Sequence, residues 1–258
     1  MASNESMKKV LTVAIVLCLV CSVVVSAAAV LLRDAQQANK ALDKKRNILA
    51  AAGLLQEGVS VEKQFEKVQI KAIDFATGTF TDAVPNPETY DQRKASKDPK
   101  LSSAVADDKD IAKINRQANY GLVYIVNNDS GNLDKVILPV KGYGLWSTLY
   151  GFLALESDFN TVAGLGFYEH AETPGLGGEV DNPLWKAKWP GKKVYDEGQV
   201  RLTILKGEVD SSNPSAQYQI DGLSGATLTS KGVDNLIQYW MGDNGYAKFL
   251  SNLKAGEA

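Results

Sequence analysis

The stretch Gly121-Leu-Val-Tyr-Ile-Val126 precedes a polar segment, 127–132, and a second apolar run, Val136-Ile-Leu138. β-Branched and aromatic residues on both sides of a short polar segment predict a β-hairpin. Further strand-like runs lie downstream, separated by glycine-rich connections: 149–155, 161–168 and 200–205. The sequence from Gly121 onward therefore predicts a mainly antiparallel sheet.

A helix is expected after these strands, starting near Thr229. Its apolar residues recur at helical spacing and so lie on one face: Val233, Leu236, Ile237 and Trp240. Strands that are segregated from helices are typical of the α+β class, whereas alternating strands and helices would indicate a parallel sheet. We therefore predict an α+β fold with flanking helices.

The N-terminal segment 10–32 contains no charged residue. At about 1.5 Å per residue, a helix of this length crosses the roughly 30 Å hydrocarbon core of a membrane, so we predict one transmembrane helix. The alternative is a cleavable signal peptide, because Lys8 and Lys9 precede the segment and residues 27–29 are small; its apolar stretch exceeds the usual length of about 7–15 residues. Basic residues flank both ends, so charge counting leaves the orientation open.

Four segments are predicted along the chain: an N-terminal tail (1–9), the transmembrane helix (10–32), a helical and irregular part (33–120) and a domain from 121 to 258. Within the third segment, helical periodicity extends from Asp34 to about Leu55. Residues 61–72 predict either a helix or, from Val68 onward, an alternating strand. The proline-marked residues 83–119 predict irregular structure.

Composition argues against several classes of function. The chain has 28 Lys and Arg against 30 Asp and Glu, so it lacks the basic surface that binds nucleic acid. One histidine, His170, cannot supply a multi-histidine metal site, and it argues against a Ser-His-Asp triad. Cys18 and Cys21 lie within the apolar segment, where one Cys-x-x-Cys pair cannot complete a tetrahedral zinc site. We expect no metal site, and we interpret the cysteines as lipid-facing or helix-packing residues.

Small and hydroxyl-bearing residues precede the last helix in Asp221-Gly-Leu-Ser-Gly-Ala-Thr-Leu-Thr-Ser230. Free N–H groups and the positive end of a helix dipole favour a phosphate at such a position, and Gly225 and Ala226 permit close approach. The alternative is a well-capped helix, since Ser and Thr are favoured there whatever the function. The segment has the spacing of neither a P-loop nor a dinucleotide-binding fingerprint.

The segment Asp221-Gly-Leu-Ser-Gly-Ala-Thr227 resembles the flavinylation motif of FMN-binding domains, Asp-x-x-Ser/Thr-Gly-Ala-Ser/Thr. The resemblance implies that a dedicated flavin transferase joins FMN, through its phosphate, to the hydroxyl of Thr227. A second block, His170-Ala-Glu-Thr-Pro-Gly-Leu-Gly177, resembles the flavin-facing loop of the same family. A threonine hydroxyl is a poor nucleophile and the motif supplies no adjacent base. Thr227 therefore fits an acceptor better than a catalytic residue, and we expect no catalytic residue in this chain.

The resemblance implies a set of cofactor-binding residues in both blocks: Asp221, Ser224, Gly225, Ala226 and Thr227, with Glu172, Thr173, Gly175 and Leu176. Thr173 and backbone N–H groups are expected to hydrogen-bond the polar edge of the flavin ring, and Leu176 to pack on its face. We interpret Asp221 both as a turn-forming residue and as a recognition and metal-positioning group for the transferase.

Three residues outside these blocks are further candidates. Trp146 and Ser147 follow a glycine-rich connection, although a tryptophan in an apolar strand is often a core residue. Lys206, at the end of a predicted strand, is interpreted either as a group that stabilises the reduced flavin or as solvated surface.

Asp43-Lys-Lys-Arg-Asn-Ile-Leu49 and the N-terminal helix resemble the C subunit of the sodium-translocating NADH:ubiquinone oxidoreductases, so the resemblance spans nearly the whole chain. It implies an anchored electron carrier in the bacterial inner membrane, with its FMN domain on the periplasmic side and other membrane subunits and lipid as partners. The related G subunit of RNF-type electron-transport complexes is the alternative.

Two further functions stay open: an anchored flavoenzyme with its own substrate, and a non-redox binding module. Flavin redox chemistry belongs to the cofactor, so a relay protein supplies tethering, orientation and electrostatic tuning. No acidic residue lies in the apolar segment 10–32, so this chain alone offers no sodium path. We therefore predict an electron relay that is not catalytic by itself.

Overall fold

A computed structural model of the protein describes residues 6–258. Its contacts divide the chain into two compact units, one that ends at Lys44 and one that comprises Lys45–Ala258. The first unit contains the helix α1 (Met7–Leu31) and the first part of α2 (Arg33–Ala51).

Helix α1 is long and apolar enough to cross a membrane, with a mean hydropathy of 2.9, and no residue of it is buried. Two hydroxyls within its apolar sequence donate back to the helix: Thr12 Oγ1 to the carbonyl of Lys8 at 2.8 Å, and Ser22 Oγ to that of Cys18 at 2.6 Å. Such internal bonds satisfy polar groups where water is absent. The predicted N-terminal apolar helix is confirmed, and Cys18 and Cys21 lie exposed on it.

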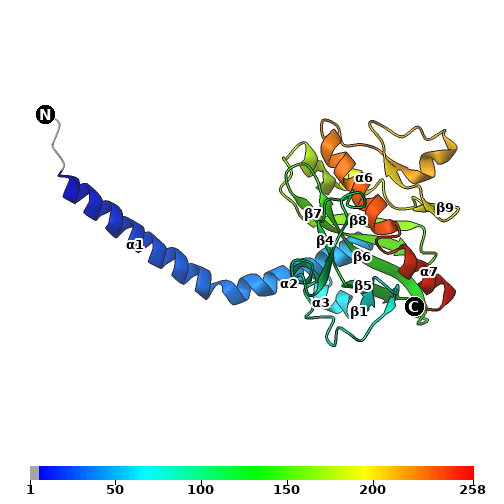
Figure 1. Ribbon diagram of the computed structural model, residues 1–258, viewed down its shortest axis with the longest axis horizontal. Coiled ribbons are helices and arrows are strands. Elements are labelled where there is room, and N and C mark those ends of the chain that lie inside the picture. Colours follow the sequence, from blue (N-terminus) through cyan, green and yellow to red (C-terminus); the bar gives the residue numbers. More distant parts are fainter. Residues whose placement is uncertain (1–5) are drawn as a thin grey trace. The chain divides into compact units, whose positions relative to one another are not determined.

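The second unit is built on an antiparallel sheet (Figure 1). Its six strands lie in the order β2 (Thr79–Phe80), β1 (Val68–Asp74), β5 (Tyr120–Asn127), β6 (Leu133–Tyr143), β7 (Thr148–Glu156), β8 (Val162–Glu169). The predicted hairpin is β5 and β6, with Tyr124 opposite Ile137. The mainly antiparallel sheet and the α+β class are therefore confirmed.

Both faces of this sheet are covered, because successive side chains of a strand point to opposite faces. On one face, Val123, Leu138 and Leu153 pack with α6 (Thr227–Met241) and α7 (Ala247–Ala255). On the other face, the alternating neighbours Tyr124, Ile137 and Phe152 pack with a second group of apolar residues. That group comes from the end of α2 and from α3 (Val61–Phe65), and comprises Ile48, Leu49, Ala51, Ala52 and Phe65.

Two aromatic side chains anchor the C-terminal helices to β6 by donating to its backbone. Trp240 Nε1 donates to the carbonyl of Lys141 at 2.7 Å, and the Tyr246 hydroxyl donates to that of Pro139 at 2.8 Å. Helix α6 begins at Thr227, two residues before the predicted start. The sequence did not predict α7.

Some local expectations differ from the structure. Residues 61–72 form both alternatives in turn, since α3 ends at Phe65 and β1 begins at Val68. The single strand expected at 200–205 is wrong, because the N–H groups of Arg201 and Leu202 both donate to the carbonyl of Val194 and turn the chain. The result is two short strands with different partners: β10 (Gln199–Val200) with β9 (Tyr195–Asp196), and β11 (Thr203–Ile204) with β12 (Gln219–Ile220).

The remaining elements are short. Within the largely irregular segment 83–119 lie α4 (Gln92–Ala95), β3 (Ser102–Ala104) and β4 (Arg116–Ala118). Between β8 and β12 lie the 3-10 helices η1 (Gly177–Asp181) and η2 (Pro214–Tyr218) and the helix α5 (Pro183–Lys186). The predicted division at residue 120 stays a prediction; β1, which precedes it, pairs along its length with β5, which follows it.

The end of α2 packs against two glycines of β8, Gly164 and Gly166. A Cβ atom at Gly164 would lie 2.3 Å from the carbonyl oxygen of Ala51, a distance that no Cβ tolerates, whereas a Cβ at Gly166 would lie 3.7 Å from the Cβ of Ala51, in ordinary contact. The two positions are two residues apart on one strand, so they share a face. The structure therefore requires glycine at 164 and not at 166.

Replacing Gly164 by alanine should lower the free energy of unfolding by about 1–3 kcal/mol, because the end of α2 must shift away from β8. Gly166→Ala is the matched control and should change it by less than about 1 kcal/mol. Thermal unfolding of the full-length protein in detergent measures both. Equal losses in the two variants would contradict the close contact at Gly164.

Candidate functional site

The sequence motif 221–227 forms a tight loop that ends where α6 begins. Gly225 has a left-handed backbone with φ +71°, and the N–H of Ala226 donates to the carbonyl of Leu223 at 3.1 Å. The Ser230 hydroxyl, one turn into α6, accepts from the N–H of Leu223 at 3.0 Å and holds the loop against the helix. Thr227 is the first residue of α6, and its side chain is exposed.

The N-terminus of α6 has no side-chain cap. Its N-cap residue is Ala226, and no side chain there accepts a bond from the first turn. The interpretation of residues 221–230 as an ordinary capped helix start is therefore wrong. The first N–H groups of a helix have no intrahelical partner and attract negative charge. The exposed hydroxyl of Thr227 thus lies at a helix end that can receive an anion.

Residues 144–147, the Trp146 turn, connect β6 to β7. The N–H of Gly144 donates to the carbonyl of Ser147 at 2.8 Å and closes the turn. Trp146 is 66% exposed, so it is not a core residue, and Leu145 is 36% exposed. The turn thus presents two large apolar side chains to solvent.

The loop 170–177 lies against the Trp146 turn. The N–H of Ala171 donates to Ser147 Oγ at 2.7 Å. His170 Nδ1 accepts from the N–H of Glu172 at 3.2 Å, which leaves Nε2 as the donor to Asp181 Oδ2 at 2.8 Å. The ring of His170 is thereby used to shape the loop.

The tip of this loop is a turn in which Gly175 adopts φ +74°. The carbonyl of Thr173 accepts from the N–H groups of Leu176 at 3.1 Å and Gly178 at 2.9 Å. The side chains of Thr173 and Leu176 are exposed, and their contact with a cofactor stays a prediction.

Glu172 lies in the same loop, but its side chain is buried, with 5% exposed. Its Oε1 accepts from the N–H groups of Leu145 at 3.1 Å, Trp146 at 3.0 Å and Ser147 at 3.3 Å. Its Oε2 accepts from the hydroxyl of Thr229 at 2.7 Å. Donors of the protein itself therefore engage both carboxylate oxygens.

Burial by itself would raise the pKa of the Glu172 carboxyl. The hydroxyl of Thr229 and the backbone donors of the Trp146 turn outweigh burial and hold that pKa below its usual range. Glu172 is therefore a buried carboxylate at neutral pH.

Close contacts bring the three segments together. A Cβ at Gly225 would lie 3.0 Å from Leu176 Cδ2, so the motif touches the 170–177 loop. A Cβ at Gly232 would lie 2.4 Å from the carbonyl oxygen of Tyr143, so α6 lies directly on the chain that enters the Trp146 turn. Four exposed apolar side chains come from these segments: Leu145, Trp146, Leu176 and Leu228. We call these four residues the apolar surface.

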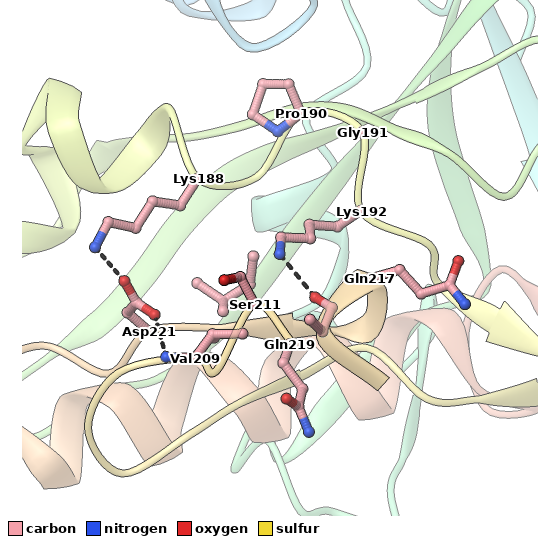
Figure 2. Close-up of a pocket in the computed structure, with 11 residues that line it drawn as sticks. Lys188, Pro190, Gly191, Lys192, Val209, Ser211, Gln217, Gln219 and Asp221 are labelled. Atoms are coloured by element: carbon pink, nitrogen blue, oxygen red, sulfur yellow. Dashed lines mark hydrogen bonds and ion pairs between the residues drawn. The ribbon is translucent and has the colours of Figure 1, made fainter. Parts of the chain in front are cut away.

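Asp221, at the other end of the motif, has a different environment (Figure 2). Its carboxylate pairs with the Lys188 ammonium and accepts from the N–H of Val209 at 2.6 Å, and its backbone carbonyl accepts from Trp185 Nε1 at 2.8 Å. Burial tends to raise its pKa, but these donors outweigh it and hold the pKa low. Asp221 thus ties the motif to two other loops.

A cavity of about 520 Å³ adjoins this ion pair and is lined by Lys188, Pro190, Gly191, Lys192, Val209, Ser211, Ala216, Gln217, Gln219, Ile220 and Asp221. Figure 2 shows Lys188 and Lys192 entering from one side and Asp221 from the other. Of residues 221–227, all described by the structure, Asp221 lines the cavity and Thr227 does not. The apolar surface is likewise separate from the cavity lining.

Lys206 is exposed in the loop that follows β11. The carbonyl of the neighbouring Gly207 accepts from the N–H of Gly222 at 2.8 Å, so this loop adjoins the motif 221–227. Among the described residues, no group of three or more His, Cys, Asp or Glu side chains is placed to hold a metal ion.

Sequence reasoning missed Thr229 and Gly232 as residues that shape the site. Thr229 stood among the noted hydroxyls, but its partner Glu172 is 57 residues away in the chain. Gly232 gave no local signal, since a glycine within a helix is informative only when the element packed against it is known.

Residues 144–242 match the model of the FMN-binding domain family. This range contains the Trp146 turn, the 170–177 loop and the motif that ends at Thr227. The class of protein that the fold and the site define is therefore one with an FMN-binding domain.

The comparison extends over the full chain. This chain is 56% identical to the C subunit of the Na(+)-translocating NADH-quinone reductase of Pseudomonas aeruginosa, with 100% of each chain covered. It is 48% identical to the corresponding protein of Vibrio vulnificus over 99% of both chains. The crystal structure of Shewanella oneidensis NqrC is similar with a TM-score of 0.78 and 38% identity, covering 84% of this chain and 99% of that one. The chain belongs to the NqrC family, the C subunits of Na(+)-translocating NADH-quinone reductases.

The lowered pKa of Glu172 predicts acid destabilisation. A carboxyl whose pKa is lowered in the folded state contributes stability above the unfolded-state value of about 4.3, and loses it as the pH falls through the folded-state value. Glu172→Gln cannot titrate, so the difference in free energy of unfolding between wild type and variant should shrink from about pH 7 to about pH 3. Urea unfolding at each pH measures it.

The control is Glu57→Gln, which removes an exposed carboxylate. Its stability difference from wild type should be small throughout this pH range. A wild-type advantage over Glu172→Gln that stays constant with pH would show that the Glu172 carboxyl is not the titrating group.

Proposed function

We propose that this chain carries FMN covalently, through a phosphoester on the hydroxyl of Thr227, and relays electrons within a sodium-translocating NADH-quinone reductase complex. The observation that carries the proposal is the exposed Thr227 at the uncapped start of α6, next to the apolar surface. The match to the FMN-binding domain family and the full-length similarity to NqrC proteins support it.

The residues around Thr227 fit FMN. The N–H groups at the start of α6 suit a phosphate, and a phosphoester there has favourable electrostatics with the helix dipole. Gly225 has no side chain to obstruct the phosphate, and Ser224 offers an exposed hydroxyl beside it. Large exposed apolar side chains suit the flat face of a ring system. Bound FMN would supply the capacity to accept and release electrons.

The protein's own residues would hold the ring. Leu176 and Trp146 offer apolar contact, and Thr173 and the backbone around Gly175 offer hydrogen-bond donors. Lys206 would bring positive charge to the reduced flavin. Ser147 would act through the loop, since its hydroxyl accepts from Ala171.

Attachment forms an ester bond between Thr227 Oγ and phosphorus, with the net loss of one water. Among the described residues, no base accepts a hydrogen bond from the Thr227 hydroxyl, so we assign attachment to a separate flavin transferase. Asp221, held at the edge of the cavity by Lys188 and Val209, fixes the start of the motif for that enzyme.

Relatives that are similar over their whole length are named as the C subunit of a Na(+)-translocating NADH-quinone reductase. These names favour the sodium-translocating complex over an RNF-type complex. The chain lacks a dinucleotide-binding fingerprint, so NADH would be oxidised by another subunit. The protein is then part of an oxidoreductase and is not catalytic by itself.

The apolar helix α1 would anchor the protein in the bacterial inner membrane, in contact with lipid and other membrane subunits. Its mean hydropathy and its internally bonded hydroxyls suit a single crossing. The domain that follows would lie on the periplasmic side, where the transferase is expected to act.

Thr227→Ala should abolish covalent flavin, because it removes the one oxygen to which the phosphate is joined. Full-length protein is produced together with a flavin transferase, and its intact mass is taken after denaturation. Wild type should be heavier than the sequence by FMN less one water, and Thr227→Ser should keep this increment. An unmodified wild-type mass, or an increment that survives in Thr227→Ala, would refute attachment at Thr227.

The location of the domain is tested by fusions to the full-length chain. Alkaline phosphatase joined after Ala258 should be active in cells, since that enzyme matures only outside the cytoplasm. A fluorescent protein joined at the same point should stay dark, and the same protein joined at the N-terminus should be bright. The reverse pattern would place the domain in the cytoplasm.

A further inference from the structure

We propose that Glu172 is a positioning residue whose buried carboxylate holds the Trp146 turn against the first turn of α6, and whose negative charge lowers the reduction potential of the flavin. The second half rests on the proposed function, since it requires a flavin on Thr227. The first half concerns the protein alone.

Three backbone donors of the Trp146 turn bind the same oxygen of Glu172. Three consecutive N–H groups, from Leu145 to Ser147, point at Glu172 Oε1. Consecutive N–H groups that face one point form an anion-binding concavity, and here the anion is a side chain of the protein. A Cβ at Gly144 would lie 2.6 Å from this oxygen, so the residue that starts the turn must be glycine for the carboxylate to fit.

The other carboxylate oxygen reaches the helix that carries the attachment point. Oε2 accepts from the hydroxyl of Thr229, which is fully buried and lies two residues after Thr227 in the same turn of α6. A Cβ at Gly177 would lie 2.5 Å from Thr229 Oγ1 and 2.7 Å from Glu172 Oε2. The end of the 170–177 loop therefore packs directly against this hydrogen bond. One carboxylate therefore connects all three segments around Thr227.

The charge of Glu172 is balanced by dipoles and not by a cation. In the part of the chain that the structure describes, no Lys, Arg or His forms an ion pair with it. An ion pair would cancel most of its field, whereas amide and hydroxyl dipoles leave a net negative charge. Interactions between charges are stronger at a poorly solvated position than in water. A flavin on the adjoining apolar surface would be harder to reduce.

Glu172→Gln separates charge from geometry, because the amide has the same shape, its oxygen can accept from the turn, and its NH₂ can donate to Thr229. Covalently flavinylated full-length protein is titrated spectroelectrochemically. The variant should favour the reduced flavin at least tenfold, which is about +30 mV for a two-electron couple. The matched control is Glu179→Gln, which removes a half-buried carboxylate of the same region whose bond to Asn182 an amide can replace. It should shift the potential by less.

The positioning role of Glu172 is tested without flavin, in protein that carries Thr227→Ala. Amide hydrogen exchange at Leu145, Trp146 and Ser147 should be at least tenfold faster when Glu172→Ala is added, and Glu172→Gln should restore most of the protection. Exchange in β6, away from the turn, reports whether the domain is still folded.

The outcomes are distinct. Unchanged exchange in the turn of Glu172→Ala would overturn the positioning role. A potential that shifts no more in Glu172→Gln than in Glu179→Gln would overturn the electrostatic role. If Thr227 carries no flavin, the electrostatic role falls with the proposed function, whereas the exchange data still decide the positioning role.

Discussion

The arrangement of the site depends on the direct contact of α6 with the backbone at the end of β6. Gly232 lets the helix approach the carbonyl oxygen of Tyr143 at a distance that a methyl group would prevent. Trp240, two turns further along α6, fixes the same helix to Lys141 of β6. With its position on the sheet set at two points, α6 has its first turn beside the Trp146 turn, and Thr227 at its start is exposed.

Two anions share this end of α6 in the proposed holoprotein, and the structure supplies them with separate donors. Glu172 uses a hydroxyl, from Thr229, and the three N–H groups of the Trp146 turn. The backbone N–H groups at the start of α6 have no side-chain cap and stay available for the phosphoester. The buried carboxylate therefore does not compete with the phosphate for donors, although their charges repel.

Local signals account for what could be predicted from the sequence. The hairpin around Val123 and Ile137 follows from apolar runs on both sides of a polar turn. Thr227 is singled out by a motif of seven neighbouring residues, and its role as the attachment point stays a proposal. The role of Glu172 depends on donors about 25 and 57 residues away, which no local pattern reveals. A tryptophan in an apolar strand is often a core residue, and only the structure shows that Trp146 lies exposed in a turn. The break in the strand expected at 200–205 depends on one acceptor outside that run, the carbonyl of Val194, which the apolar pattern of the run does not reveal.

The exposure of the apolar surface bears on the choice between a relay and an enzyme with its own substrate. Leu145, Trp146, Leu176 and Leu228 lie on an open surface, and the described cavity of about 520 Å³ is lined by other residues. An enzyme that acts on a small substrate gains from a site that excludes water. A carrier gains from a ring that partner proteins can approach, because its electrons must pass to another cofactor. An open apolar surface, beside a threonine at the start of a helix, is the geometry that a relay requires.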